Sequence, residues 1–224
     1  MNYVLHYGQV TPYLPYLLGG ALVSLWISAL AFAGGLVIGV LGAFGRIYGG
    51  PVLSRLIYAY YIFFTNTPQL VQIFFLFYGL ADFGLLLTPF QAVWLGLTLN
   101  AGAYLIEIQK AGFLSTRASE LEASETLGMS RLQQLRFVII PHIARVLFPP
   151  LSNQFIIVIM GSSMGAIFGL EELTGRAVNV NGQTFRALEV FSLAGLIYFV
   201  VTLLATVGLA LVGRLALRVP MRIA

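Results

Sequence analysis

The sequence predicts an all-α membrane protein that crosses the bilayer with five transmembrane helices. Of its 224 residues, 59% are hydrophobic and only 9% are charged, against roughly 25% charged residues in an ordinary soluble domain. The mean hydropathy is +0.91. Backbone groups inside the hydrocarbon core have no water to bind, so each apolar stretch must satisfy its own hydrogen bonds as a helix. We interpret residues 1–224 as a single transmembrane domain.

Five stretches reach the length of about 20 mostly apolar residues that a membrane-spanning helix needs. They are residues 16–44, 56–80, 90–108, 146–170 and 188–212. The proline- and tyrosine-rich segment 11–18 overlaps the start of the first stretch, and it predicts a short interfacial helix. The first stretch is rich in glycine and contains the pattern Gly35-x-x-x-Gly39. This pattern favours close packing between helices, with dimerisation as the alternative interpretation.

The basic residues orient the chain, because cytoplasmic loops of membrane proteins carry an excess of Lys and Arg. With the N-terminus outside, only Arg176 and Arg186 fall in outer loops. Ten bases then face the cytoplasm: Arg46, Arg55, Lys110, Arg117, Arg131, Arg136, Arg145, Arg214, Arg218 and Arg222. The pattern predicts an outer N-terminus, an inner C-terminus and a cytoplasmic loop between the third and fourth spans. The larger outer loop, residues 171–186, carries charges of both signs. It could receive a binding protein by complementary charge, and a merely solvated loop is the alternative.

The cytoplasmic loop, about residues 114–145, is the longest polar interruption in the chain. A capping box S-x-x-E begins at Ser119 and a second one, S-x-x-Q, begins at Ser130, so each predicts the start of a helix. Gly128 is placed to end the first helix. Pro141 either stops the second helix or lies in the first turn of a third. We therefore expect a compact helical loop and not a flexible linker.

The function of this loop is left open by its composition alone. Leu127 and Met129 form an apolar tip on either side of Gly128. Such a tip suits insertion into the groove of a partner protein. Folding of these two side chains back onto the loop's own helices is an equally good interpretation.

The sequence at residues 122–141, 64–72 and 100–107 resembles motifs of a known family, the permease subunits of type I ABC importers for polar amino acid uptake. The stretch E-A-S-E-T-L-G-M-S-R-L-Q-Q-L-R-F-V-I-I-P at residues 122–141 is similar to the EAA loop of that family. Residues 64–72, F-T-N-T-P-Q-L-V-Q, resemble the family pattern F-R-G-T-P-L-L-V-Q, and residues 100–107, N-A-G-A-Y-L-I-E, resemble N-S-G-A-Y-x-x-E. The resemblance covers nearly the whole chain in order.

The resemblance implies a permease in a bacterial cytoplasmic (inner) membrane, working with several partners. These are a second permease subunit in a homo- or heterodimer, two cytoplasmic ATPase subunits that use ATP and Mg, and an extracytoplasmic solute-binding protein. It also implies that the loop contains the helix that couples the permease to the ATPase. The residues carried over for this coupling are Glu122, Ala123, Glu125, Leu127, Gly128 and Met129.

The sequence gives no indication that this chain catalyses a reaction. The only lysine, Lys110, is preceded by Gln109, so the P-loop pattern G-x-x-x-x-G-K-[ST] is missing. The sequence has no cysteine, and the predicted topology places His6 and His142 on opposite sides of the membrane. We therefore expect neither an enzyme, nor a metal site, nor a cofactor. The net charge of +4 comes from bases at the membrane borders, so we expect contact with lipid and not with nucleic acid.

Uncharged polar residues within the spans are candidates for a translocation pathway, because an amide or hydroxyl in lipid needs a polar partner or water. The candidates are Asn66, Thr67, Gln72, Asn100, Tyr104, Asn153, Ser162 and Ser163. Hydrogen bonding between helices is the alternative role for each. Pro68 is expected to break the second helix among them. Glu107 is a possible gate, although pairing with Lys110 three residues later is the simpler interpretation.

The chain departs from the family pattern at two places. Thr65 stands where the family usually has arginine, and residues 160–164, M-G-S-S-M, stand where it usually reads K-D-T-S-L. These losses leave open whether this subunit holds a site for a charged solute.

An ATP-driven importer of polar amino acids is the leading hypothesis. The alternatives are a secondary carrier or channel that does not use ATP, and a scaffold that anchors a cytoplasmic enzyme.

Overall fold

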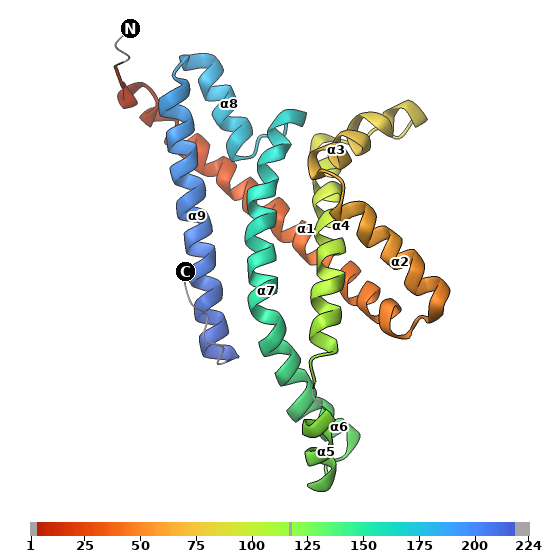
Figure 1. The fold of residues 1–224 in the computed structure, drawn as a ribbon. Helices are drawn as coiled ribbons and strands as arrows, with labels where there is room; N and C mark the ends of the chain where they lie inside the picture. Colours follow the sequence, from red (N-terminus) through yellow and green to blue (C-terminus); the bar gives the residue numbers. More distant parts are fainter. Residues whose placement is uncertain (1–3, 117, 218–224) are drawn as a thin grey trace.

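The computed structural model describes residues 4–116 and 118–217. Every regular element in this part of the chain is helical (Figure 1). In chain order they are η1 (Tyr7–Gln9), η2 (Thr11–Tyr13), α1 (Leu14–Tyr48), α2 (Gly50–Thr65), α3 (Gln69–Phe74), η3 (Phe75–Gly79), η4 (Ala81–Phe83), α4 (Pro89–Phe113), α5 (Ala118–Thr126), α6 (Arg131–Gln134), η5 (Leu135–Ile139), α7 (Ile140–Gly161), η6 (Ser162–Phe168), α8 (Leu173–Thr184) and α9 (Ala187–Ala216).

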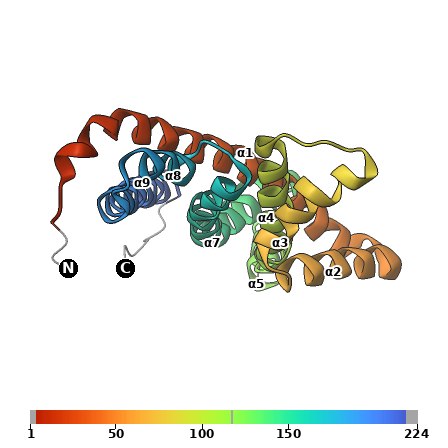
Figure 2. The ribbon, with the colours of Figure 1, turned by 90° about the horizontal axis from the view of Figure 1, so that it is seen from above.

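The long helix α1 braces the molecule. Seen from above, it runs along one side of α9, α7 and α4 in turn (Figure 2). The short helices α5 and α6 project beyond one end of the bundle, whereas α8 lies at the other end (Figure 1). One core cluster forms where α1, α3, α4 and α7 meet, around Ile27, Leu97 and Val158. A second forms where α1, α8 and α9 meet, around Leu17, Leu173 and Val190.

Glycine lets α1 and α4 approach closely. A Cβ atom on Gly39 would lie 2.8 Å from the Cβ of Leu105 and 3.1 Å from its backbone carbon, and one on Gly35 would lie 3.2 Å from the backbone nitrogen of Gly102. A methyl group at either position would therefore press on the facing helix. The Gly35-x-x-x-Gly39 pattern packs against α4 of the same chain, which confirms the packing interpretation.

Three helical segments among the described residues are long and apolar enough to cross a membrane: Tyr7–Tyr48, Arg131–Phe168 and Ala187–Ala216. They contain the first, fourth and fifth predicted spans. The second predicted span, residues 56–80, is divided between α2 and α3. Pro68 occupies the N-cap position of α3 in an extended conformation, so the predicted break at this proline is confirmed. The count of five spans stays a prediction.

Several local predictions were wrong in detail. The segment 11–18 is not a separate helix, because η2 runs directly into α1 at Leu14. Residues 171–186 are not a loop, since α8 fills most of this segment. Its first turn is capped by the carboxylate of Glu172, which accepts from two backbone N–H groups.

The structure decides between the two positions predicted for Pro141, in favour of the first turn of a further helix. This proline lies in the first turn of α7, directly after the π-helical turn η5. A π turn widens the helix locally. A proline in the first turn replaces an N–H that is unpaired at most helix starts, so the helix continues through it. The loop is therefore joined to the fourth predicted span by one continuous helical segment.

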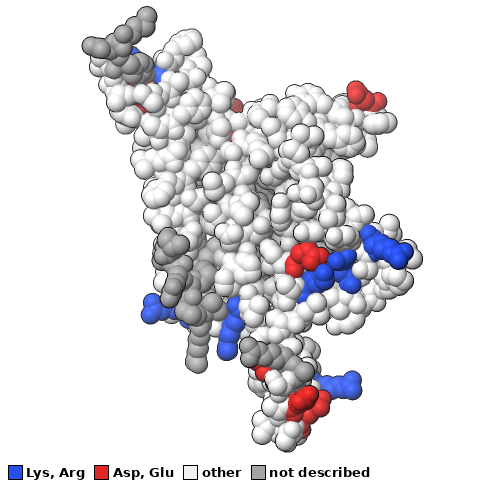
Figure 3. Space-filling view, in the orientation of Figure 1, with Lys and Arg blue, Asp and Glu red and all other residues white. Residues whose placement is uncertain are grey.

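The basic side chains are distributed unevenly between the two ends of the bundle. On the face shown in Figure 3, most Lys and Arg side chains lie toward the end that carries α5 and α6. Arg176 and Arg186 belong to α8 and its C-terminal flank. The other described bases belong to the last turns of α1, α4 and α9, to α2, and to the helical run from α6 through η5 into α7: Arg46, Lys110, Arg214, Arg55, Arg131, Arg136 and Arg145. Arg117, Arg218 and Arg222 lie outside the described residues. This distribution agrees with the asymmetry used to predict the orientation.

The glycine contact predicts opposite effects for the same substitution at two sites. Gly39→Ala should lower the free energy of unfolding by about 1–3 kcal/mol, because its methyl group meets the backbone of α4. Gly208→Ala in α9 meets no heavy atom within 4 Å and should stabilise the helix by up to about 1 kcal/mol. Thermal unfolding of the detergent-purified protein measures both. Equal shifts for the two variants would contradict the packing argument.

Candidate functional site

A cluster of amides lies at the break between α2 and α3. Pro68 has no N–H, so the Phe64 carbonyl four residues earlier loses its helical donor. The Nε2 of Gln72 donates to this carbonyl at 2.9 Å and the Nδ2 of Asn100 donates to it at 3.1 Å. Asn100 also donates to the Oε1 of Gln72 at 3.2 Å. Both side chains are buried, so they stabilise the break from inside the protein.

The neighbouring pathway candidates bond locally. The Nδ2 of Asn66 donates to the Ile62 carbonyl at 2.8 Å, and the hydroxyl of Thr67 donates to the Phe63 carbonyl at 2.8 Å. Gln72 reaches the Thr67 hydroxyl at 2.7 Å. The structure brings Thr67, Gln72 and Asn100 together, but as hydrogen-bond partners of a broken helix. For these residues the simpler role, bonding within the protein, is the one observed.

The remaining pathway candidates do not share one cavity. Tyr104 and Asn153 are exposed, and Ser162 is buried with its hydroxyl donating to the Ile159 carbonyl at 2.7 Å. Ser163 lines a cavity of about 380 Å³ between the end of α7, η6 and α9. The residues that line it are Met160, Ser163, Gly195, Tyr198, Phe199 and Thr202. Ser163 is therefore the one predicted pathway residue among those that line this cavity.

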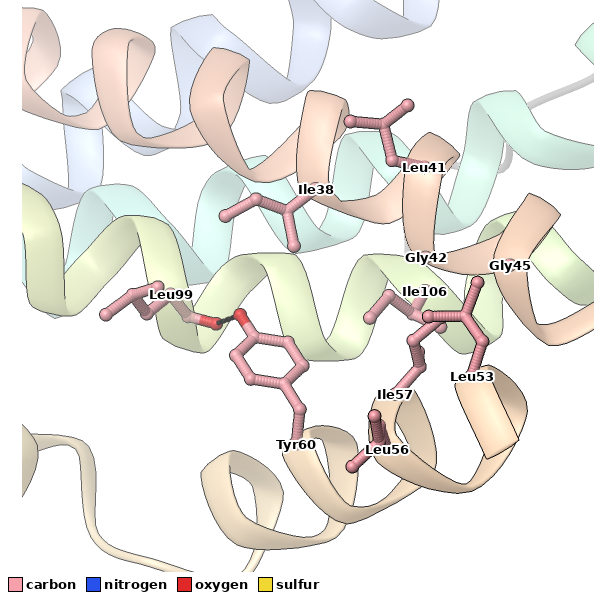
Figure 4. Close-up of a pocket in the computed structure, with 10 residues that line it drawn as sticks. All are labelled: Ile38, Leu41, Gly42, Gly45, Leu53, Leu56, Ile57, Tyr60, Leu99 and Ile106. Carbon is pink, nitrogen blue, oxygen red and sulfur yellow. Dashed lines mark hydrogen bonds between the residues drawn. The ribbon is translucent and has the colours of Figure 1, made fainter. Parts of the chain in front are cut away.

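A wider groove of about 570 Å³ lies between α1, α2 and α4 (Figure 4). Ile38, Leu53 and Ile106 are among the apolar side chains that form its walls. Its one polar side chain, Tyr60, donates to the Leu99 carbonyl at 2.6 Å. The groove has no free polar group for a polar solute, so it is a poor candidate for the pathway.

The loop between α4 and α7 is compact, and its corner has a defined geometry. Gly128 has φ of +71°, a conformation that glycine adopts without the penalty of a Cβ atom. Its N–H donates to the Glu125 carbonyl at 2.9 Å, and the Met129 N–H donates to the Ser124 carbonyl at 3.1 Å. These two bonds form a Schellman motif. The predicted glycine end of the first loop helix is confirmed.

The predicted cap at Ser119 is wrong, because α5 has already begun at Ala118. The second capping box is confirmed: the Ser130 N–H donates to Gln133 Oε1 at 2.8 Å, and the Gln133 N–H donates to the Ser130 hydroxyl at 3.4 Å. His142 Nδ1 in α7 lies 3.5 Å from Glu120 Oε2. The helix α5 is thus held to α7 by the chain itself and by this side-chain pair.

The loop presents apolar and acidic side chains at its surface. Leu127 is 80% exposed, so it does not fold back onto the loop. Glu122, Ala123, Glu125 and Gly128 are exposed as well, and Met129 is half-buried. Leu132 and Phe137 on the following turns add two more exposed apolar side chains. The loop therefore combines a fixed backbone with an unpartnered apolar surface.

Glu107 and Arg46 together link α1, α2 and α4. Its carboxylate lies 3.1 Å from Lys110 Nζ in α4 and 3.5 Å from the Arg46 guanidinium at the end of α1. Arg46 also lies over the ring of Tyr58 in α2, at 4.6 Å from the centroid. The predicted Glu107–Lys110 pair is present. Arg46 is a second partner that sequence spacing could not indicate, because it is 61 positions away.

The sequence prediction missed a buried carboxylate. Glu172 is fully buried, and four donors surround its two oxygens: the Gly175 N–H at 2.8 Å, the Thr174 N–H at 3.0 Å, the Ser24 hydroxyl at 3.1 Å and the Tyr198 hydroxyl at 2.7 Å. The available signal was an acidic residue directly before a polar helix start, a common N-cap position. It was overlooked because the segment was assigned to a solvated loop.

Within the described ranges, no three His, Asp or Glu side chains gather as a metal site would require.

Comparison with known proteins gives three concordant results. A sequence profile described as "Binding-protein-dependent transport system inner membrane component" matches residues 35–218. The glutamine transport system permease protein GlnP of Escherichia coli (strain K12) is 37% identical over 199 residues, covering 88% of this chain and 91% of its own. The octopine transport system permease protein OccM of Rhizobium meliloti is 39% identical over 163 residues, covering 68% and 66%.

Two solved structures share the fold. The first, described as an amino acid ABC transporter with histidines, has a TM-score of 0.86 at 29% identity, covering 95% of this chain and 99% of its own. The second, the MetNI methionine ABC transporter in an inward-facing conformation, has a TM-score of 0.64 at 19% identity, covering 90% and 98%. The latter similarity concerns the fold alone.

The amide cluster predicts different costs for two asparagine substitutions. Asn100→Leu removes the donor to Gln72 Oε1 and one of two donors to the Phe64 carbonyl. We expect the free energy of unfolding to fall by about 1–3 kcal/mol, because a buried acceptor is left unpaired. The matched change Asn153→Leu alters an exposed amide and should stay within about 0.5 kcal/mol. Thermal unfolding in detergent compares them, and a larger shift for Asn153→Leu would refute the assignment.

Proposed function

The chain belongs to the family of binding-protein-dependent transport system inner membrane components, and on this premise we propose how it works as a permease subunit of an amino acid ABC importer. The solutes are polar amino acids, delivered by an extracytoplasmic binding protein. Two separate cytoplasmic ATPase subunits supply the energy from ATP and Mg, and a second permease subunit completes the pathway. The relatives named for glutamine and octopine transport support this class of solute.

The α5 loop is the observation that carries this proposal. It has a fixed geometry, from the Schellman motif at Gly128 to the capping box at Ser130, and it exposes Leu127 almost completely. A rigid exposed apolar anchor is typical of a binding surface. The continuous helical segment from Arg131 to Phe168 then connects this surface to the cavity beside Ser163. Movement of α5 is in this way transmitted along α7 to the interior.

The proposed topology has five spans, an outer N-terminus and the α5 loop in the cytoplasm of a bacterial inner membrane. The bases gathered at the end with α5 support this orientation. The helix α8 then lies on the outer side, where the binding protein docks. In this arrangement α2 and α3 together form the second span, broken at Pro68.

We propose alternating access as the mechanism. Closure of the ATPase subunits on ATP moves the two α5 helices, the membrane helices rock, and the pathway opens to the outside. Hydrolysis resets the complex. Glu107 forms part of an inner gate in this mechanism, and the ion pairs of its carboxylate with Arg46 of α1 and Lys110 of α4 support that role.

The uptake experiment uses the permease, its ATPase and its binding protein reconstituted in liposomes. We expect accumulation of labelled glutamine only when ATP is enclosed with the ATPase subunits. Equal uptake without ATP would sink the importer hypothesis and favour a carrier or a channel. Omitting the binding protein is the second control, and it should reduce uptake strongly.

The loop surface makes a separate prediction. Leu127→Asp replaces an exposed side chain, so the permease should fold and insert normally. It should lose co-purification with the ATPase by at least about tenfold, because a charge in an apolar groove is unpaired. Leu86→Asp is the matched control, since Leu86 is 82% exposed in the segment before α4 at the opposite end. The coupling role fails if both variants retain the ATPase and solute-stimulated hydrolysis.

A further inference from the structure

The buried carboxylate of Glu172 lies directly behind the wall of the cavity near Ser163. It connects three elements, since it caps α8, accepts from Ser24 of α1 and accepts from Tyr198 of α9. Tyr198 also lines the cavity. A fully buried ionisable residue at this depth carries a cost that structure or function must offset. Two of the hydrogen bonds of Glu172 cap the first turn of α8. A third joins Glu172 to Tyr198, whose side chain lines the cavity.

The proton of Tyr198 is committed to Glu172. A tyrosine hydroxyl has one proton and can also accept, and a carboxylate at 2.7 Å is the acceptor here. The Thr174 hydroxyl, 3.0 Å from the Tyr198 oxygen, must then donate to it. The tyrosine oxygen is left with acceptor capacity only.

The other two hydroxyls of the cavity also donate their protons to groups within the protein. Ser163 donates to the Met160 carbonyl at 2.8 Å, and Thr202 donates to the Tyr198 carbonyl at 2.8 Å. Each hydroxyl has a single proton, so each presents lone pairs to its surroundings. The lining contains no charged side chain. The cavity therefore offers hydrogen-bond acceptors without a negative charge on its wall.

We propose that this cavity recognises an uncharged N–H donor, the carboxamide of an amino acid side chain, and that Glu172 is the positioning residue that sets this polarity through Tyr198. The inference rests on the proposed function for the idea that the cavity takes solute. It adds the group that is recognised and the residue that enforces the choice. With Glu172 as the acceptor, Tyr198 cannot turn its proton toward the solute.

The test measures binding and not uptake. The purified permease–ATPase complex is titrated with labelled L-glutamine, and unlabelled L-glutamine competes against L-glutamic acid γ-methyl ester, which has similar size but lacks the amide protons. We expect the wild-type complex to prefer the amide by about tenfold, the size expected for one hydrogen bond. Failure of ATP-driven uptake would sink the proposed function, yet this binding ratio would still be measurable.

Three variants separate positioning from folding. Glu172→Gln places an amide against Tyr198 and should abolish the tenfold preference, because its N–H group can donate to the tyrosine oxygen and free the tyrosine proton. Tyr198→Phe keeps the ring and the α8 caps, and it should lose the preference too. Thr184→Val removes a hydroxyl of α8 that donates to the Val180 carbonyl and does not line the cavity, so it should keep the preference.

The ratio is insensitive to the amount of folded protein, so partial misfolding of Glu172→Gln does not decide the outcome. If that variant cannot be purified, Tyr198→Phe and Thr184→Val still give opposite expectations. The inference is overturned if the wild-type complex does not discriminate the two compounds. It is overturned equally if Tyr198→Phe keeps the tenfold preference, or if Thr184→Val loses it.

Discussion

The constraint on which this structure depends is the absence of water from the hydrocarbon core, which forces every polar group at membrane depth to find a partner inside the protein. The Phe64 carbonyl shows the consequence most directly. Pro68 deprives it of its helical donor, and two amides from elsewhere in the fold replace that donor. Glu172 shows the same constraint for a charge, since four donors surround its carboxylate.

Lipid on the outside also removes the hydrophobic drive between helices, so close packing must hold the bundle together. The contact of α1 with α4 meets this requirement through small residues, with Gly35 and Gly39 set against the backbone of α4. The helix α1 then continues past α7 to α8 and α9 (Figure 2). A single long helix in this way fixes the relative positions of the amide cluster, the Glu172 network and the cavity near Ser163.

The α5 loop, which projects beyond one end of the bundle (Figure 1), solves the same problem in another way. Its polar groups are satisfied locally, by the Schellman motif at Gly128 and the capping box at Ser130. Its apolar side chains, Leu127 above all, are left exposed. A loop that pairs a rigid backbone with an uncovered apolar tip is suited to receive force from a partner. In the proposed mechanism, the unbroken helix from Arg131 to Phe168 carries that force into the membrane.

The sequence alone determined the fold class, the break at Pro68 and the capped corner of the α5 loop, because each depends on composition or on residues close together in the chain. Its motifs also identified the family. It could not predict that Gln72 and Asn100 serve the Phe64 carbonyl, that Arg46 joins Glu107, or that Glu172 is buried against Ser24 and Tyr198. Those partners lie between 8 and 148 positions apart, and only helix packing brings them within hydrogen-bonding distance. The tertiary structure therefore decided which polar residues hold the protein together and which remain to meet a solute.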